Sequence, residues 1–168
     1  MKRELPKITP KEYELEVKRY LEQFAGNVQS FQATHRETHS SKDGDFEIDI
    51  TVRFRALEID WLTVIECKCY TSPVERKVVM ELHAKKNALN ADKAMLFATS
   101  SFQSGAIEYA QHQGIILCHF QKVLVQRFVE NMPEKIEYLT YMFDGLDQQG
   151  HPIPRQYNYL HALLKKGR

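Results

Sequence analysis

Cysteine is scarce in this sequence, which has only three among its 168 residues. An odd number this small excludes the framework of paired disulfides that stabilises small secreted domains. The N-terminal sequence M-K-R-E-L-P-K-I-T-P also lacks the apolar core of a secretory signal. We therefore expect a protein of the reducing cytoplasm, in which the cysteines are free thiols packed in the core.

Long apolar runs and an excess of one charge are also missing. No run approaches the roughly 20 apolar residues of a membrane-spanning helix, so we expect no membrane association. Lys and Arg number 23 and Asp and Glu 22, which leaves a net charge of +1. Proteins that bind the phosphate backbone over a broad surface usually carry a clear basic excess. Any contact with nucleic acid must therefore rely on local positive charge.

The length suits one hydrophobic core, and the sequence has no internal repeat or obvious linker. A helix is predicted from Thr9, which can cap it, with Pro10 at the first position and Glu12 completing a capping box. Gly26 is expected to end this helix. The apolar residues at helical spacing along it are Tyr13, Val17, Tyr20, Leu21 and Phe24.

The following segments read as strands that alternate with helices. Residues 27–35 look extended and residues 36–45 polar. Residues 46–54 alternate, which predicts that Phe46, Ile48, Ile50, Val52 and Phe54 share one face and Glu47, Asp49, Thr51 and Arg53 the other. The continuous apolar run 61–65 indicates a central strand covered on both faces.

The second half of the chain predicts two more helices and two more strands. One helix follows Ser72-Pro73-Val74-Glu75, a second capping box, and another spans 103–112; strands are expected at 94–99 and 115–118. The order α-β-β-β-α-β-α-β predicts an α/β fold, a central mixed sheet flanked by helices. Residues 120–129 fit either helix or strand, residues 144–150 a turn and residues 157–166 a terminal helix.

The central strand ends on charges, in the sequence V-I-E-C-K-C-Y over residues 64–70. Two other Glu-x-Lys triplets lie on predicted helices, where residues two apart do not face each other. On a strand they do, so Glu66 and Lys68 should project to the same side. Burying charge costs several kcal/mol unless it is paired or bound to a metal. The simpler alternative is a strand end that emerges into solvent with a surface salt bridge.

Asp49 on the neighbouring strand favours a functional site. Adjacent antiparallel strands place such side chains within about 5–8 Å of each other. Asp49 and Glu66 would then form an oxygen-rich pocket suited to Mg²⁺, and a bound cation would resolve their repulsion. Lys68 beside them could orient a water or stabilise charge on a phosphate.

Asp followed by Glu-x-Lys on adjacent strands resembles the PD-(D/E)xK nuclease superfamily, and more narrowly its Mrr-like restriction endonuclease domain. The resemblance covers roughly residues 10–118 in order. The matching segments are Tyr13-Glu14 with Val17 and Leu21, Asp43-Gly44 with Ile48-Asp49-Ile50, Val64-Ile65-Glu66-Cys67-Lys68, Pro73-Val74 with Val78 and Glu81-Leu82-His83, and residues 91–102 with Ala106 and Glu108-Tyr109-Ala110.

The resemblance implies a restriction-endonuclease-like catalytic core at residues 1–118. Residues 119–168 would be a C-terminal extension packed on that core and a candidate dimer surface. It also implies that Asp49, Glu66 and the backbone carbonyl of Cys67 hold Mg²⁺, with Mn²⁺ as a substitute. Lys68 would position or activate the attacking water, and Glu14 would assist from the first helix. Helical geometry also allows Glu16 at the opposite edge of the buried face, or neither residue.

The function implied is a metal-dependent DNA endonuclease, an Mrr-like restriction or defence enzyme that hydrolyses phosphodiester bonds. Cutting both strands needs two sites, so a homodimer is expected. The weak net charge and the lack of room for a separate DNA-reading domain favour an alternative, a non-catalytic domain that keeps the fold and binds DNA or protein. A nuclease for branched DNA junctions would share the same core.

Other polar residues are weaker candidates for function. Hydroxyls at Thr99, Ser100 and Ser101, where a strand meets a helix, could contact a DNA phosphate or simply cap the helix. Arg76 and Lys77, with Lys85 and Lys86, form either a local basic stripe or a solvated helix face. Glu47 is either a further metal ligand or a solvent-facing residue, and His35 with His39 is a weak zinc candidate. C-x-C at Cys67 and Cys69 is not zinc-finger spacing.

Overall fold

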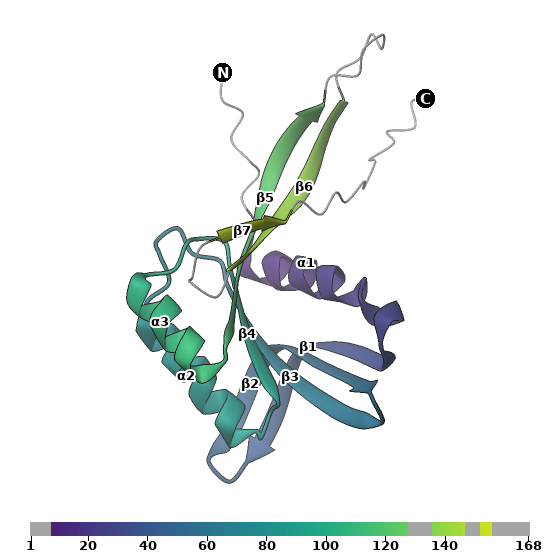
Figure 1. The fold of residues 1–168 in the computed structure, drawn as a ribbon, viewed down its shortest axis with the longest axis vertical. Coiled ribbons are helices and arrows are strands. Elements are labelled where there is room, and N and C mark those ends of the chain that lie inside the picture. Colours follow the sequence, from purple (N-terminus) through teal and green to yellow (C-terminus); the bar gives the residue numbers. More distant parts are fainter. Residues whose placement is uncertain (1–7, 128–135, 147–151, 156–168) are drawn as a thin grey trace.

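The computed structural model describes residues 8–127, 136–146 and 152–155, with side chains described for residues 8–120. Strands form a mixed sheet in which β3, β4 and β5 run parallel and the other neighbours antiparallel (Figure 1). The strands lie in chain order across the sheet: β1 (Gln29–Ser41), β2 (Gly44–Ala56), β3 (Ile59–Lys68), β4 (Lys93–Ala98), β5 (Ile116–Arg127), β6 (Ile136–Leu146) and β7 (Pro152–Arg155). The predicted α/β class and the predicted order of elements are confirmed.

Helices cover both faces of the sheet. Helix α1 (Pro10–Glu22) lies on one face, and α2 (Arg76–Ala88) and α3 (Ser104–Gln113) lie on the other (Figure 1). Both parallel connections, β3–α2–β4 and β4–α3–β5, return their helices to the same face, as right-handed crossovers require. A short 3₁₀ turn (Ala25–Asn27) follows α1 and leads into β1.

The helix ends test two predicted caps. The Thr9–Glu12 capping box forms as predicted, with the side chain of each residue bonded to the backbone N–H of the other. The second capping box is wrong, because α2 begins at Arg76 and its N-cap residue Glu75 makes no side-chain capping bond. Ser72 lies in the loop before this helix. No helix in the described part of the chain is long and apolar enough to cross a membrane.

Two hydrophobic clusters lie on opposite faces of the sheet. The cluster under α1 is built around Tyr13, Val17, Ile65 and Phe97, and the cluster under α2 and α3 contains Val64, Leu82, Leu96 and Ala106, among others. β3 contributes to both, with Val64 on one side and Ile65 on the other. This confirms that β3 is a central strand covered on both faces.

The predicted single apolar face of β2 is wrong. Phe46 and Ile48 pack in the cluster under α2 and α3, whereas Ile50 and Val52 pack in the cluster under α1. The strand therefore changes faces at Asp49. Its partner strand β1 is irregular at the same level, where Arg36 has a left-handed φ of 52°. A pattern of alternating residues cannot reveal this change, because alternation assumes a regular pleat.

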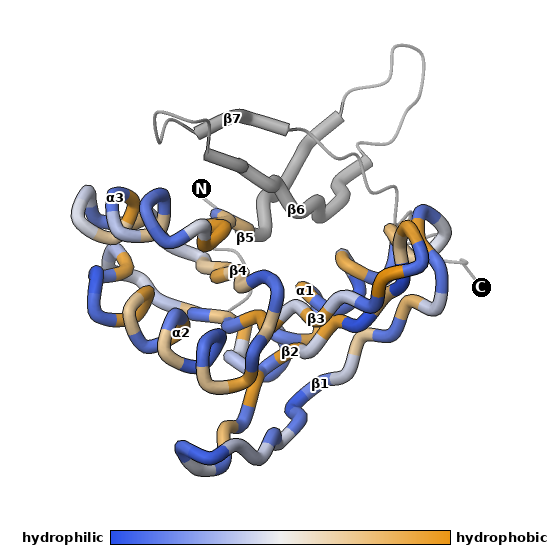
Figure 2. Tube along the Cα trace, turned by 60° about the horizontal axis from the view of Figure 1, so that its bottom comes forward, coloured by the Kyte–Doolittle hydropathy of each residue, from blue (hydrophilic) through white to orange (hydrophobic). Residues whose placement is uncertain are grey.

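β1 and β2 also run further than the sequence pattern indicated. β1 continues to Ser41 through residues expected to be merely polar, because an edge strand with one neighbour need not be apolar. Figure 2 shows that β1 is mostly hydrophilic along its length. A turn at residues 42–43 joins it to β2, so residues 29–56 form one long hairpin.

The C-terminal part extends the sheet. β5 passes through residue 118 without a break and continues to Arg127, which decides between helix and strand for most of residues 120–129. The predicted turn at 144–150 is wrong in its first residues, because β6 continues to Leu146. Its later residues and the predicted helix at 157–166 lie outside the described residues. Division at residue 118 into core and extension stays a prediction.

Candidate active site

Glu66 and Lys68 project from the same side of β3, at the end of the strand. Lys68 Nζ lies 3.0 Å from Glu66 Oε2. The side chain of Glu66 is 8% exposed and that of Lys68 24%. The pair is therefore largely enclosed rather than a surface salt bridge. Val64 continues the same side inward, while Ile65 and Cys67 pack on the side of α1.

A second ammonium reaches Glu66 from α2. Lys85 Nζ lies 2.6 Å from Glu66 Oε1 and donates a hydrogen bond to the backbone carbonyl of Glu47 at 3.2 Å. The sequence pattern indicated only a basic stripe or a solvated helix face at this residue. A signal for its true position was available, because Lys85 follows the buried Leu82 by three residues and so shares its helix face.

Asp49 lies where β2 and β3 stop pairing. The last pair at this end of their ladder joins Ile50 to Ile65, and Asp49 is the adjacent residue of β2 just beyond that pair. Asp49 Oδ2 accepts a 2.7 Å hydrogen bond from the backbone N–H of Cys67. The N–H and C=O of one strand residue project to the same edge of the strand. The Cys67 carbonyl therefore also projects toward the side of β2, beyond the end of the ladder.

Asp49, Glu66, Lys68 and Lys85 form a cluster of charged side chains at the end of β3, and these charges act on one another. Burial, and then the negative charge of Glu66, raise the pKa of the Asp49 carboxyl above its usual range. The Cys67 hydrogen bond and the positive charge of Lys68 oppose this increase only in part. Two carboxylates that repel each other in a half-buried position favour a cation between them.

Lys68 remains an ammonium in this setting. Burial alone would lower the pKa of Lys68, but the charge and hydrogen bond of Glu66, with the charge of Asp49, raise it above its usual value. A lysine with a raised pKa is protonated at neutral pH. Lys68 can therefore donate hydrogen bonds and stabilise negative charge, but it is poorly suited to accept a proton from water.

Glu14, rather than Glu16, points inward from α1. The Glu14 side chain is 7% exposed, and one of its oxygens, Oε2, lies 2.6 Å from His35 Nε2 and 2.9 Å from Arg36 Nε. Glu16 pairs instead with Arg19 along the helix surface. Burial would raise the pKa of Glu14, but hydrogen bonds from Arg36 and His35 and their charges hold it below its usual value. Of the two alternatives left by the helical wheel, only Glu14 is placed near the cluster.

Arg36 joins Glu14 to the Asp49 side of the cluster. It lies opposite Asp49 in the β1–β2 ladder, between the pairs His35–Ile50 and Glu37–Ile48. Its guanidinium also bonds Glu14 Oε1 at 3.2 Å, and its side chain is 45% exposed. The hydrogen bond and charge of Glu14, and more weakly the charges of Glu47 and Asp49, raise the pKa of Arg36. No periodic signal pointed to Arg36, because it lies in the segment read only as polar, residues 36–45.

The weaker DNA-binding candidates are only partly accessible. The Thr99 hydroxyl donates to the Tyr70 carbonyl, and Ser100 Oγ is enclosed without a hydrogen-bond partner among the described residues. Ser101 is exposed, as is the Lys77 side chain, which pairs with Glu75 at 3.0 Å.

Arg76 is exposed on the same helix as Lys77. Its guanidinium lies 5.1 Å from the ring centroid of Tyr109. Arg76, Lys77 and Ser101 therefore do not join the cluster around Glu66.

The zinc alternative finds no support. His35 contacts Glu14 under α1, whereas His39 bonds Thr51 Oγ1 at 2.9 Å, so the two rings serve different neighbours. Among described residues, no three His, Cys, Asp or Glu side chains form a metal-ligating group. Burial raises the pKa of the Cys67 and Cys118 thiols, which makes them neutral core residues as predicted.

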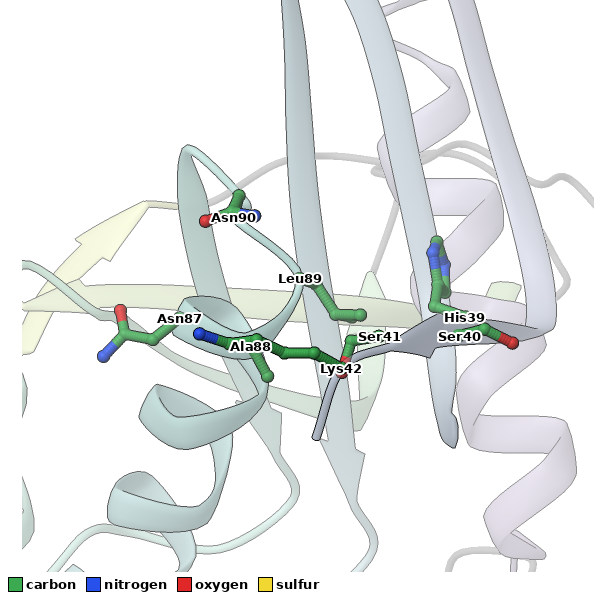
Figure 3. Close-up of a pocket in the computed structure, with 8 residues that line it drawn as sticks. All are labelled: His39, Ser40, Ser41, Lys42, Asn87, Ala88, Leu89 and Asn90. Carbon is green, nitrogen blue, oxygen red and sulfur yellow. The ribbon is translucent and has the colours of Figure 1, made fainter. Parts of the chain in front are cut away.

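A polar hollow of about 420 Å³ lies apart from the cluster, between the β1–β2 turn and the end of α2 (Figure 3). None of the predicted catalytic residues lines it. The lining residues are His39, Ser40, Ser41, Lys42, Asn87, Ala88, Leu89 and Asn90.

Glu47 was the further candidate for a metal ligand. Its side chain is exposed, and its backbone carbonyl accepts a hydrogen bond from Lys85.

The donor set around Asp49 fits a hard divalent cation. Two carboxylates and a carbonyl are oxygen ligands, which Mg²⁺ and Mn²⁺ prefer, and Mg²⁺ commonly takes only one or two protein carboxylates with water as the remaining ligand. Burial first, and then the charge of Glu66, raise the pKa of Asp49, and a cation beside the carboxylate would oppose both effects. Glu66 is already paired with two ammoniums, and their charges would oppose a cation on the same carboxylate.

Comparison with known proteins places the fold. Protein AF1548, described as of unknown function, superposes with a TM-score of 0.54 at 22% identity, over 65% of this chain and 57% of that one. Protein VC1899 from Vibrio cholerae superposes with a TM-score of 0.50 at 18% identity, over 64% of this chain and 29% of that one. This chain thus spans less than two thirds of either protein.

A third structure, the DNA modification-dependent restriction endonuclease AspBHI, gives a TM-score of 0.34 at 20% identity, over 67% of this chain and 33% of that one. Among curated proteins no match is found. The family model Mrr_cat, described as restriction endonuclease, matches residues 5–125. Since that match covers most of the sequence and the mixed sheet with flanking helices is the expected one, the chain belongs to the Mrr-type family of restriction endonuclease domains.

Proposed function

We propose that this protein is a metal-dependent DNA endonuclease that hydrolyses phosphodiester bonds. The observation that carries the proposal is the meeting of Asp49, Glu66 and Lys68 at the end of β3, in a chain of the restriction endonuclease family. Two acids and an ammonium in a largely enclosed position are costly to keep unless they serve a purpose.

Asp49, Glu66 and the Cys67 carbonyl would hold Mg²⁺, with Mn²⁺ as a substitute. When bound, such an ion supplies Lewis acidity and lowers the pKa of a coordinated water. The Asp49–Cys67 hydrogen bond holds the carboxylate in place beforehand, so little side-chain freedom is lost when the site is used.

Lys68 supplies a fixed positive charge at the reacting phosphate. As an ammonium it would orient the attacking water through a hydrogen bond and stabilise the charge that develops on the phosphate oxygens. Glu14 would act as a positioning residue, because it anchors Arg36 opposite Asp49 rather than pointing freely into the site.

Contacts with DNA would come from exposed residues outside this cluster, among them Ser101, Arg76 and Lys77. A homodimer would bring two sites to the two strands of a duplex, with residues 119–168 as its candidate surface. Three free thiols suit a reducing cytoplasm.

One observation favours a second candidate, a non-catalytic domain that binds DNA or protein. Glu66 has an ammonium on each oxygen, so its charge is balanced without a metal. Such a domain would show neither metal affinity that depends on Glu66 nor any cleavage.

The test is a cleavage screen of the full chain on supercoiled, linear and branched DNA with Mg²⁺ or Mn²⁺. We expect cutting, and a loss of about 10²- to 10³-fold on Lys68→Ala, as for removal of one transition-state donor. Lys18→Ala is the matched control, because Lys18 ends the Glu-x-Lys triplet of α1 and pairs with Glu22 on the surface. Intact DNA in every condition, or equal cutting by Lys68→Ala, would refute the proposal.

A further inference from the structure

Both carboxylate oxygens of Glu66 are occupied by lysines from different elements. Lys68 of β3 bonds Oε2 and Lys85 of α2 bonds Oε1, the latter at 2.6 Å. The charge of Asp49 also acts on Lys68, so two lysines balance two carboxylates, yet both lysines are hydrogen-bonded to Glu66. The contact of Lys85 with Glu66 therefore calls for its own explanation. Lys85 is not part of the Asp and Glu-x-Lys set and has no role in the function proposed above.

The two lysines differ in what else they can bind. The Lys68 ammonium donates a hydrogen bond to Glu66, whereas Lys85 donates both to Glu66 and to the Glu47 carbonyl, the latter at 3.2 Å. Lys85 can therefore leave Glu66 and keep one acceptor. Its side chain is 26% exposed, so water can complete its remaining hydrogen bonds.

Lys85 and a divalent cation would compete for the same oxygen. Each carboxylate oxygen has two lone pairs, so the competition is one of charge: a positive charge within hydrogen-bond distance of Oε1 repels an incoming cation. If the cation binds only after Lys85 has left Oε1, the apparent affinity for the cation is reduced by the fraction of molecules in which Lys85 has left.

We propose that Lys85 is a positioning residue that occupies Glu66 Oε1 in the metal-free protein and sets the threshold concentration for metal binding. This rests on the proposed function, because it requires that Glu66 be a metal ligand. In the absence of a cation, Lys85 holds Glu66 in place. When a cation binds, Lys85 withdraws to the Glu47 carbonyl and solvent.

The experiment is a Mn²⁺ titration of the full chain without DNA, followed by calorimetry and by the electron paramagnetic resonance signal of free Mn²⁺. We expect Lys85→Met to bind Mn²⁺ about tenfold more tightly than the wild type. Lys86→Met is the matched control on the next residue of α2 and should leave the affinity unchanged. Equal or weaker binding by Lys85→Met would overturn the proposal, because a purely structural Lys85 would not oppose the metal.

Two further variants complete the test. Lys85→Arg keeps a charged donor and should retain weak, wild-type affinity; Lys85→Gln should bind tightly and serves if Lys85→Met does not fold, as judged by circular dichroism. Tight binding by Lys85→Arg would count against competition by charge.

Failure of this inference and failure of the proposed function give different results. If Glu66→Gln loses the Mn²⁺ binding of the wild type but Lys85→Met has the wild-type affinity, the metal site is supported and only the proposed role of Lys85 is refuted. If Glu66→Gln binds as the wild type does, or if no variant binds Mn²⁺, the proposed metal site itself falls, and this inference with it.

Discussion

Asp49 Oδ2 and the backbone N–H of Cys67 are joined by a 2.7 Å hydrogen bond across the end of the β2–β3 ladder. The side chain thus takes over as acceptor where backbone pairing has stopped. One contact holds the carboxylate, marks the point where β2 changes faces and leaves the Cys67 carbonyl turned toward the same side. Replacing Asp49 by asparagine removes its charge but keeps an oxygen that can accept this hydrogen bond, and the first prediction uses that difference.

Asp49→Asn should abolish cleavage and Mn²⁺ binding while leaving the fold intact, because an amide oxygen can still accept from Cys67. Since burial and Glu66 raise the pKa of Asp49, its charge destabilises the folded protein at neutral pH. The melting temperature should therefore be equal to or above that of the wild type, with the gain shrinking as the pH falls and Asp49 becomes protonated. Asp49→Ala loses the acceptor as well and should melt lower than Asp49→Asn.

Glu14→Gln should destabilise the protein by about 1–3 kcal/mol, because it leaves His35 and the partly exposed Arg36 without their carboxylate. Glu16→Gln is the matched control on the same helix and should cost about 0.5 kcal/mol or less, as expected for a surface pair with Arg19. Urea unfolding measures both. We expect DNA cleavage to fall in Glu14→Gln only; equal effects of the two changes would contradict the inward placement of Glu14.

Acid should weaken the fold partly through Glu14 and Glu37. Hydrogen bonds from Arg36 and His35 outweigh burial at Glu14, and hydrogen bonding by Arg53 does so at Glu37, so both carboxyls have pKa values below the ordinary 4.5. Their stabilisation is fully present above that value and is lost as the pH falls through the lower pKa of the folded state. Glu14→Gln and Glu37→Gln should each lose less stability than the wild type between about pH 6 and about pH 3.

Comparison of unfolding free energies at several pH values checks this acid dependence. A steeper loss in either variant than in the wild type would contradict it. Lys18→Ala removes only a surface pair with Glu22 and leaves the partners of both carboxyls in place, so it should follow the wild-type slope.

Arg36 and Arg53 should respond in opposite ways to glycine. Arg36 has a left-handed φ of 52°, which costs an L-residue about 1–2 kcal/mol and glycine nothing. Arg53 lies in β2, where glycine is about 0.5–1 kcal/mol worse than alanine. Both arginines form a bidentate pair with a glutamate, so removing either side chain loses a comparable interaction.

Arg36→Gly should therefore be more stable than Arg36→Ala, whereas Arg53→Gly should be less stable than Arg53→Ala. Urea midpoints of the four variants decide the matter. The same order at both positions would mean that the backbone of Arg36 is not in the left-handed region.

Local patterns predicted those parts of the molecule that depend on neighbours in the chain. The Thr9–Glu12 capping box involves residues three apart, and the shared side of Glu66 and Lys68 involves residues two apart on a strand. In each case the geometry of one helix or one strand settles the contact. The apolar run before Glu66 likewise indicated burial on both faces, and both clusters contain residues of it.

Contacts between segments that are distant in the chain were not predicted from the sequence. Ile48 and Ile50 read as one face, yet they pack in opposite clusters, and the neighbouring strand has a left-handed residue, Arg36, at the same level. The contact of Lys85 with Glu66 spans 19 positions and two elements, and its only trace was helical spacing from Leu82.

The sequence by itself determined the order of helices and strands, the central position of β3 and the acids and lysine at its end, because spacing along one element fixes which side chains are neighbours. The tertiary structure alone decided that Asp49 rests on the Cys67 N–H, that Glu14 is held by Arg36 and His35, and that two ammoniums share Glu66. Those contacts depend on where β2 leaves the ladder and how α1 and α2 pack on the sheet. Such positions arise from the burial of the whole core, and no short stretch of residues encodes them.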